Sequence, residues 1–188
     1  MILKGLTPYS QSRYLDMDNE VLKKRPDENC ESHDERIWRE KGYWNSNDQM
    51  IVPRRQIRVM LSSIAQYKSM KVEGQGQSTY TKYFKSGILI NEDFSITDEN
   101  RNSITKSNVE METIHVVTKG GNRLTNRFPI VRNWIITGSI TITDPIITKK
   151  IFTEHLNDAG VYMGLGHFRV GNGGNFGTFK IEDIKFST

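Results

Sequence analysis

A glycine-rich stretch, GLGHFRVGNGGNFGTFKI, runs from Gly164 to Ile181 near the end of the 188-residue chain. It follows a helical pattern and leads into the last strand-like pattern. Glycine loses more backbone entropy on folding than any other residue, so six glycines in this stretch have to serve a purpose. Either the loop has left-handed dihedral angles, or something approaches its backbone closely. The last part of the sequence therefore predicts a helix, a tight loop and a strand, in that order.

Three segments have helical patterns, and the third of them is the one that precedes the glycine-rich stretch. In residues 32–44, Ser32 is placed to cap a short helix, Glu35 is placed as its capping-box partner, and Gly42 is placed to end it. Pro53 suits the start of a second helix, in which Ile57 and the apolar residues after it form one buried stripe. Residues 145–164 form a third, amphipathic pattern. These helices are separated by segments of another period.

Alternating apolar residues and turn signals predict a strand that begins at residue 2 and ends at Pro8, and a turn into a short strand within 44–52. Further strands are predicted at 87–91, 111–119, 133–144 and 177–186. Together with the helices, this order predicts an α+β fold of the ferredoxin-like (RRM-like) type, a β-α-β-β-α-β sandwich with insertions. We expect residues 1–188 to form a single domain. Polar composition predicts mobile excursions at about 16–32 and 71–86.

The positive charge of the chain lies in particular segments. Residues 1–100 carry 15 Lys/Arg and 15 Asp/Glu, whereas residues 101–188 carry 11 and 7, which accounts for the net charge of +4. Two stretches without acidic residues stand out, one between Asp48 and Glu73 and one between Glu112 and Asp144. Basic runs without acids are typical of surfaces that meet a polyanion, although a solvated basic surface has the same composition.

Several candidate nucleic-acid-binding residues follow from these stretches. Cations at a helix start oppose the helix dipole, which is more readily understood if the arginines after Pro53 meet an anion. Lysines beside Tyr80, Tyr83 and Phe84 accompany rings that are suited to base stacking or to packing. The basic candidates are Arg54, Arg55, Arg58, Lys82, Lys85, Lys119, Arg123, Arg127 and Arg132.

The glycine-rich stretch itself allows three interpretations. A dinucleotide fingerprint places its glycines after a strand and before a helix, which is the reverse of the order here. A phosphate loop of the Walker type requires Gly-Lys-Ser/Thr, which is absent. A loop that lies against a nucleic-acid backbone remains, with charge and hydrogen bonds from its polar residues and with rings that either stack on bases or pack in the core. Its candidate residues are Gly164, Gly166, His167, Arg169, Gly173, Gly174 and Phe176.

Two segments of the sequence resemble segments of a known protein superfamily. The terminal GLGHFRVGNGGNFGTFKI resembles the Gly-rich loop of the RAMP superfamily, and IVPRRQIRVMLSSIA (51–65) resembles the helix start of its CRISPR backbone subunits. Most of the chain also resembles a family of phage and prophage proteins that open with a GLTP-like strand and close with GLGxxR…FGxF. It departs from that pattern at Thr178, where an Arg is usual, and in the additional GNGGN.

This resemblance implies a RAMP-like protein, encoded by a phage or prophage, that binds single-stranded RNA or DNA through its phosphates with little sequence preference. It also implies self-association head to tail along the strand, because heterologous contacts generate open assemblies. No run of apolar residues reaches membrane-spanning length and no signal peptide is evident, so we expect no membrane partner and a location in the cytoplasm of a bacterial host cell.

Other classes of function remain open. HExxH and clustered carboxylate–histidine spacings are absent, and Cys30 is the only cysteine, so we expect no metal and no cofactor. A metal-independent endoribonuclease with His167 as its base is one alternative, although a single histidine is more often structural and we expect a binding protein rather than an enzyme. A second is a protein-interaction module that mimics a CRISPR subunit in counter-defence.

Overall fold

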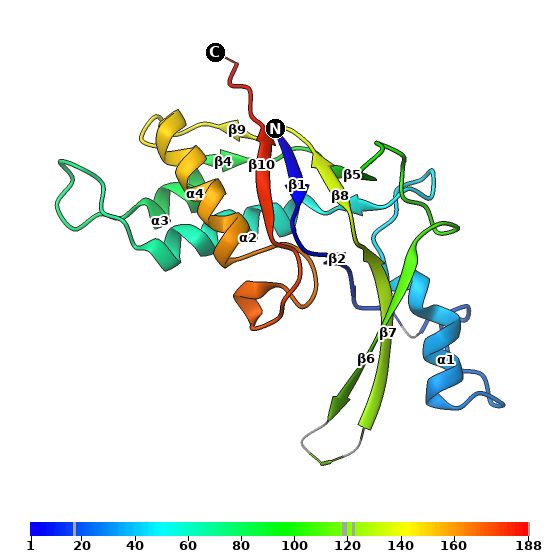
Figure 1. The fold of residues 1–188 in the computed structure, drawn as a ribbon. Coiled ribbons are helices and arrows are strands. Elements are labelled where there is room, and N and C mark those ends of the chain that lie inside the picture. Colours follow the sequence, from blue (N-terminus) through cyan, green and yellow to red (C-terminus); the bar gives the residue numbers. More distant parts are fainter. Residues whose placement is uncertain (17, 118–119, 122, 188) are drawn as a thin grey trace.

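The computed structural model describes residues 1–16, 18–117, 120–121 and 123–187. Its architecture is mixed α+β, with four α-helices and three antiparallel sheets in the described part of the chain (Figure 1). In chain order the elements are β1 (Ile2–Gly5), β2 (Tyr9–Ser10), α1 (Cys30–Ile37), the 3₁₀ helix η1 (Trp38–Lys41), β3 (Ile51–Val52), α2 (Arg54–Lys68), α3 (Tyr80–Ser86), β4 (Ile88–Leu89), β5 (Phe94–Asp98), β6 (Glu110–Val117), β7 (Arg123–Val131), β8 (Trp134–Thr137), β9 (Thr141–Ile142), α4 (Lys149–Tyr162), the 3₁₀ helix η2 (Val170–Asn172) and β10 (Phe179–Asp183).

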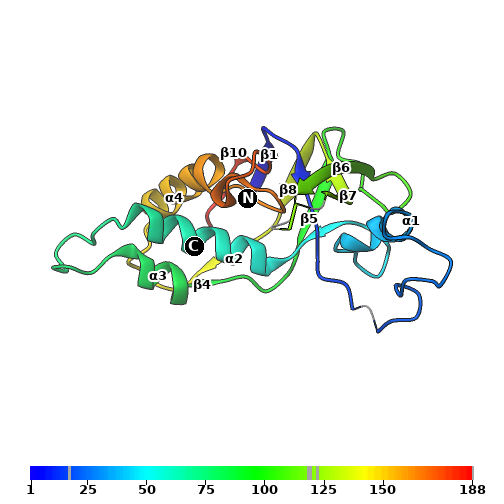
Figure 2. The same ribbon diagram turned by 90° about the horizontal axis from the view of Figure 1, so that it is seen from below.

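The main sheet has five strands in the order β10-β1-β8-β5-β3, and every neighbouring pair is antiparallel. Helices α2 and α4 cover one face of this sheet (Figures 1 and 2). Alternate strand residues, including Leu3, Ile96 and Ile136, point toward the helices and are buried. Since side chains alternate along a strand, the other residues form an opposite face, and none of the helices described covers that face.

A long hairpin of β6 and β7 pairs with β2 in a second sheet and extends away from the main sheet (Figure 1). Helix α1 lies against β7, and Asp34 of α1 accepts a hydrogen bond from the Arg127 amide at 2.7 Å. Strands β4 and β9 form a third, two-stranded sheet beside the helices. Segments outside the main sheet and its two covering helices thus lie before α2, between α2 and β5, between β5 and β8, between β8 and α4, and between α4 and β10.

The structure confirms the helix after Pro53 and the amphipathic helix at α4, with Ile57, Leu61 and Ile64 buried. It corrects the first helix, whose cap is Asn29: the Asn29 side chain accepts from the amides of Glu31 and Ser32. Ser32 occupies the third helical position and completes a capping box with Asn29, so the helix begins earlier in the chain than predicted.

Two other predictions change. The strand predicted over 133–144 is interrupted at Gly138, where a β-carbon would collide with the ring of Phe94, so β8 and β9 join different sheets. The excursion predicted at 71–86 contains helix α3, because Tyr80 and Phe84 are buried in the core and hold residues 80–86 against α2 and α4. Those two rings are therefore packing residues and are not free to stack on a base.

Candidate nucleic-acid interface

The start of α2 carries three exposed arginines, Arg54, Arg55 and Arg58. An anion does meet this helix start, and it belongs to the chain itself: the Asp93 carboxylate accepts a hydrogen bond from the Arg54 amide at 2.8 Å. A carboxylate at this position compensates the helix dipole. The dipole argument from the sequence therefore does not require an external anion, and the case for the arginines depends on their side chains.

These side chains bring α2 and α3 together. The guanidinium of Arg58 donates to the backbone carbonyl of Lys85 at 3.0 Å, and that of Arg54 donates to the carbonyl of Asn91 at 2.7 Å. Lys82 and Lys85 are exposed on α3, and the Lys82 ammonium lies 4.7 Å from the centre of the Tyr83 ring. Two segments that are separate in the sequence thus place their basic side chains on one surface.

We call Arg54, Arg55, Arg58, Lys82 and Lys85 the cationic cluster. Within the described part of the chain, none of its side chains has a carboxylate oxygen within 4.0 Å. Like charges held together without counter-ions raise the free energy of the folded state, and a bound polyanion relieves this cost. Other arginines of the chain do pair with carboxylates, namely Arg36, Arg101, Arg127 and Arg132.

The basic residues of the hairpin do not join this cluster. Arg127 is a strand residue whose side chain is only 11% exposed, because it pairs with Glu31 at 3.0 Å and lies 3.9 Å from Asp34. Arg132 pairs with Glu110 at 2.9 Å and Glu112 at 3.4 Å. Both guanidinium groups are thus neutralised within the chain. Lys119 and the side chain of Arg123 lie outside the described residues.

The Gly-rich loop, residues 164–177, packs closely against other backbone segments of the same chain. Gly166 has φ +84°, and a β-carbon there would collide with the Ser10 carbonyl. β-Carbons at Gly174 and Gly177 would collide with the carbonyls of Phe168 and Leu165. The density of glycine is therefore explained by left-handed dihedrals and by close packing of protein backbone on protein backbone. Both of the purposes predicted for these glycines are served without a ligand.

Parts of the loop nevertheless stay accessible. Gly173 has φ +80° and open space around it, whereas Gly164, at φ +65°, is buried beside the backbone of Gly177. Arg169 and Phe176 are half-buried and pair with each other through a parallel backbone bridge. Among the described residues, no carboxylate lies within 4.0 Å of the Arg169 guanidinium. Arg169 is thus a further cation without a counter-ion.

His167 is held as a packing residue. Its amide donates to the Ser10 carbonyl at 2.7 Å, and the Ser10 hydroxyl donates to the His167 carbonyl at 2.6 Å. The ring packs edge-on against Phe128 and Phe168. Burial, with a smaller effect of the Lys41 charge, lowers the pKa of His167 below its ordinary value. Its Nε2 is buried and has no hydrogen-bond partner in the described structure, which is unlike a base poised to act on a bound substrate.

Tyr9 connects the Gly-rich loop to α2. Its ring lies where a β-carbon on Gly166 would fall, and its hydroxyl donates to the Gln56 side chain at 3.1 Å. Gln11 donates to the same hydroxyl at 2.7 Å. Burial raises the pKa of Tyr9 far above its ordinary value, so this bridge stays neutral. The loop and the arginine-bearing helix, which are distant in the sequence, are therefore neighbours in the fold.

The open face of the main sheet carries a further pair of cations. Lys4 and Lys180 are exposed and lie directly opposite each other on β1 and β10. Sequence reasoning missed this pair, because only the strand register brings the two residues together. None of the described strand residues on this face is aromatic, so it lacks the stacking rings by which RRM sheets bind bases.

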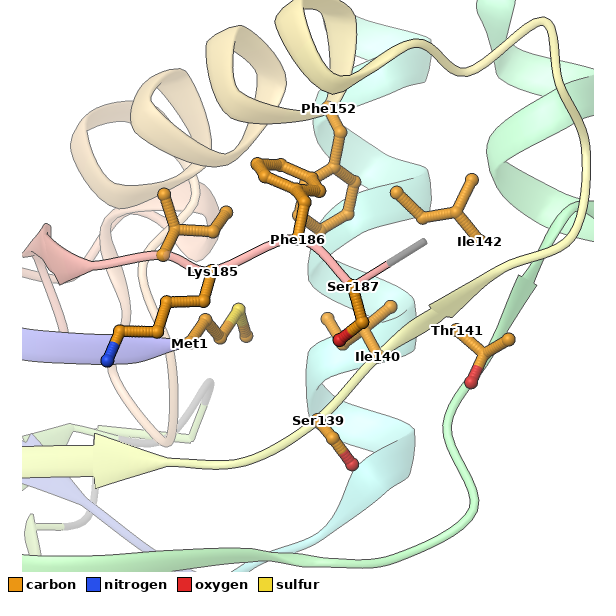
Figure 3. A pocket seen from close by; sticks show the side chains of 10 residues that line it. Met1, Ser139, Ile140, Thr141, Ile142, Phe152, Lys185, Phe186 and Ser187 are labelled. Carbon is orange, nitrogen blue, oxygen red and sulfur yellow. The ribbon is translucent and has the colours of Figure 1, made fainter.

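A pocket with a volume of about 450 Å³ lies at the N-terminal end of β1, and no candidate residue lines it (Figure 3). Its walls come from Met1, residues 139–142 around β9, Phe152 of α4 and residues 184–187, and Phe152 and Phe186 pack edge-on inside it. The proposed binding residues thus lie on open surface and not around this pocket.

The chain matches no protein-family model and no curated protein. The described residues contain no cluster of His, Cys, Asp or Glu that could hold a metal ion. None of the helices described is long and apolar enough to cross a membrane.

Proposed function

We propose that this protein binds single-stranded nucleic acid through the phosphate backbone, and that the cationic cluster on α2 and α3 is the centre of its binding surface. The observation that carries the proposal is that five exposed cations from two helices lie together without a carboxylate partner among the described residues. Guanidinium and ammonium groups are the main phosphate contacts of nucleic-acid-binding proteins. Arg169 of the Gly-rich loop, which lies outside both helices, adds a sixth cation to the proposed binding surface.

An extended polyanion fits this surface better than a small anion does. The five side chains lie on the exposed sides of two helices, and none of them lines the pocket beside Met1, the pocket beside Arg132 or the open hollow at Lys149. A small phosphate ligand is usually enclosed by convergent backbone and side-chain donors. A chain of phosphates instead needs a row of separated charges, with affinity that falls steeply with salt.

We further propose that the fold is a RAMP-like variant of the ferredoxin-like sandwich. The strand order β10-β1-β8-β5 and the chain order β1, α2, β5, β8, α4, β10 both agree with a β-α-β-β-α-β unit. The position of the Gly-rich loop between α4 and β10 supports the resemblance of residues 164–181 to the Gly-rich loop of the RAMP superfamily. Head-to-tail assembly along the strand and an origin in a phage or prophage remain part of this proposal, as does action in the bacterial cytoplasm.

The test is fluorescence anisotropy with labelled single-stranded RNA, single-stranded DNA and duplex DNA across a salt series. We expect single strands to bind, with a negative slope of log K against log salt. The double variant Arg55→Glu/Lys85→Glu leaves the hydrogen bond from Arg58 to the Lys85 backbone carbonyl in place, so it is expected to remove binding while its circular dichroism and melting temperature stay near wild type. Light scattering on the same samples tests assembly, which requires the particle mass to grow with oligonucleotide length.

A matched control makes the same change of charge at the start of another helix. Lys149 and Lys150 are exposed at the start of α4 and do not belong to the cluster, so Lys149→Glu/Lys150→Glu is expected to bind nearly as wild type. Equal losses in both variants would reduce the proposal to a general effect of net charge. No binding of any oligonucleotide by the wild type at low salt would instead favour a protein-interaction module.

A further inference from the structure

Two tyrosines form an exposed stack where α4 crosses α2. The rings of Tyr67 and Tyr162 lie with their centres 5.7 Å apart and their planes inclined by 29°. Their side chains nevertheless stay in solvent, with 65% of Tyr67 and 50% of Tyr162 exposed. Val161, 54% exposed, precedes Tyr162 in the chain. Large aromatic side chains normally bury most of their surface, so an exposed pair marks a contact site.

The stack belongs to the same helix as the arginines of the cationic cluster. Arg55 lies in the first turn of α2 and Tyr67 in its last turn. At about 100° per residue Tyr67 is turned about 120° around the helix from Arg55, so a strand that contacts both crosses the exposed side of α2. On the other side, the carbonyl of Met163, next to Tyr162, accepts a hydrogen bond from Gly171 of the Gly-rich loop at 2.9 Å. The stack thus joins the arginine-bearing helix to the segment that leads into the Gly-rich loop.

Two carboxylates near the stack are partly neutralised, so they repel a polyanion less than two free carboxylates would. The nearby carboxylates, Glu154 and Asp158, both accept hydrogen bonds from the ammonium of Lys68. Lys68 compensates one of the two negative charges and fixes both carboxylates between the helices. The exposed residues of the stack are three, Tyr67, Tyr162 and Val161, whereas a protein partner typically covers about 800 Å² on each side with roughly 20–30 residues. A flat group the size of a nucleobase suits two rings better than a protein does.

We propose that the Tyr67–Tyr162 stack binds an unpaired base of the strand whose phosphates lie on the cationic cluster. This inference rests on the proposed function and adds to it the reason for preferring single strands, since only an unpaired base offers its face. Stacking on an aromatic ring is tolerant of sequence because every base has a π-face. The preference for single strands then arises from α2 and α4, and not from the open sheet face.

The experiment compares oligo-dT with an oligonucleotide of equal length that has abasic sites and therefore the same phosphates. We expect the wild type to bind oligo-dT about 5- to 150-fold more tightly than the abasic strand, as loss of one stacked base predicts. Tyr67→Ala/Tyr162→Ala is expected to lose this preference with its salt dependence unchanged, and Tyr67→Phe/Tyr162→Phe to keep it. Tyr14→Ala, at a residue 92% exposed and remote in sequence from both helices, is the matched control.

The outcomes separate this inference from the function on which it rests. If the alanine variant keeps the wild-type preference for oligo-dT, the stack does not bind a base, although phosphate binding by the cluster stands. If the alanine variant instead changes only the particle mass measured by light scattering, the stack is a contact between copies and the inference is wrong. If the wild type binds neither strand, both proposals fall together.

Discussion

The guanidinium of Arg58 donates a hydrogen bond to the backbone carbonyl of Lys85 over 3.0 Å. This contact ties the first turns of α2 to the end of α3, and the two basic segments form one surface because of it. Each residue keeps an exposed charge with no carboxylate within 4.0 Å among the described residues. The proposed function depends on this surface, and so do its most direct consequences for binding.

Replacing one cation of the cluster should change the salt dependence by a definite amount. For single strands, the slope of log K against log salt is about −0.7 for each phosphate contact. Arg55 is exposed and has no side-chain hydrogen bond in the described structure. Arg55→Gln is therefore expected to make the slope shallower by about 0.7. Titrations at four salt concentrations measure this, and an unchanged slope would show that Arg55 meets no phosphate.

Arg127 and Arg132 should behave differently from the cluster and from each other. The Arg127 side chain is 11% exposed and pairs with Glu31 and Asp34. Arg127→Ala is therefore expected to lower the free energy of unfolding by about 1–3 kcal/mol. The Arg132 side chain is 53% exposed in its pair with Glu110, and Arg132→Ala is expected to cost less than about 1 kcal/mol. Urea denaturation measures both changes.

The same two variants also test the surface assignment. Neither is expected to change the salt slope of nucleic-acid binding, since both guanidinium groups are already neutralised within the chain. A shallower slope for folded Arg127→Ala would show that the hairpin takes part in binding, and would contradict the cluster as the centre of the surface.

Alanine substitutions at two glycines of the Gly-rich loop distinguish the cost of a left-handed backbone from the cost of a steric collision. Gly166 and Gly173 both have left-handed dihedrals, at φ +84° and +80°. At Gly173 a β-carbon meets open space. Gly173→Ala is therefore expected to lower the free energy of unfolding by about 1–2 kcal/mol, which is the cost of the left-handed backbone alone. Gly166→Ala adds a collision with the Ser10 carbonyl and should cost about 1–3 kcal/mol more. Equal losses in urea denaturation would mean that Ser10 yields without strain.

Two histidines should make the protein less stable in weak acid. Burial lowers the pKa of His155 and of His167 in the folded state below the ordinary value of 6.5. A lowered folded pKa means that the unfolded chain takes up protons first, so both contributions to stability are complete above about pH 6.5 and are lost as the pH falls through the folded values. The free energy of unfolding should therefore decrease between pH 7.5 and 5.

The variant His155→Phe isolates one of these contributions. The His155 ring stacks on Phe84 at 4.5 Å and meets Tyr80 edge-on, while the charges of Lys68, Glu154 and Asp158 also act on its pKa. Since phenylalanine fits the aromatic surroundings and has no proton to gain, we expect a smaller loss of stability between pH 7.5 and 5 than in the wild type. An identical pH dependence would show that His155 is already solvated in the fold.

Much of the local structure is predictable from the sequence because its causes are local. The spacing of Ile57, Leu61 and Ile64 fixes the buried face of α2, and the cluster of glycines after α4 requires a loop with left-handed dihedrals. Asn29 was missed as a cap because Ser32 and Glu35 form an equally good local pattern, and only the hydrogen bonds of the folded chain select between the two.

The candidate site was decided mainly by contacts between distant segments. The basic residues after Pro53, the glycines in the loop after α4 and the α+β order of helices and strands all follow from the sequence. Contacts between distant segments of the folded chain neutralise Arg127 with α1, bring Asp93 to the start of α2 and place Tyr67 beside Tyr162. Periodicity and turn chemistry act over a few residues, whereas charge neutralisation and exposure depend on which other parts of the chain pack alongside.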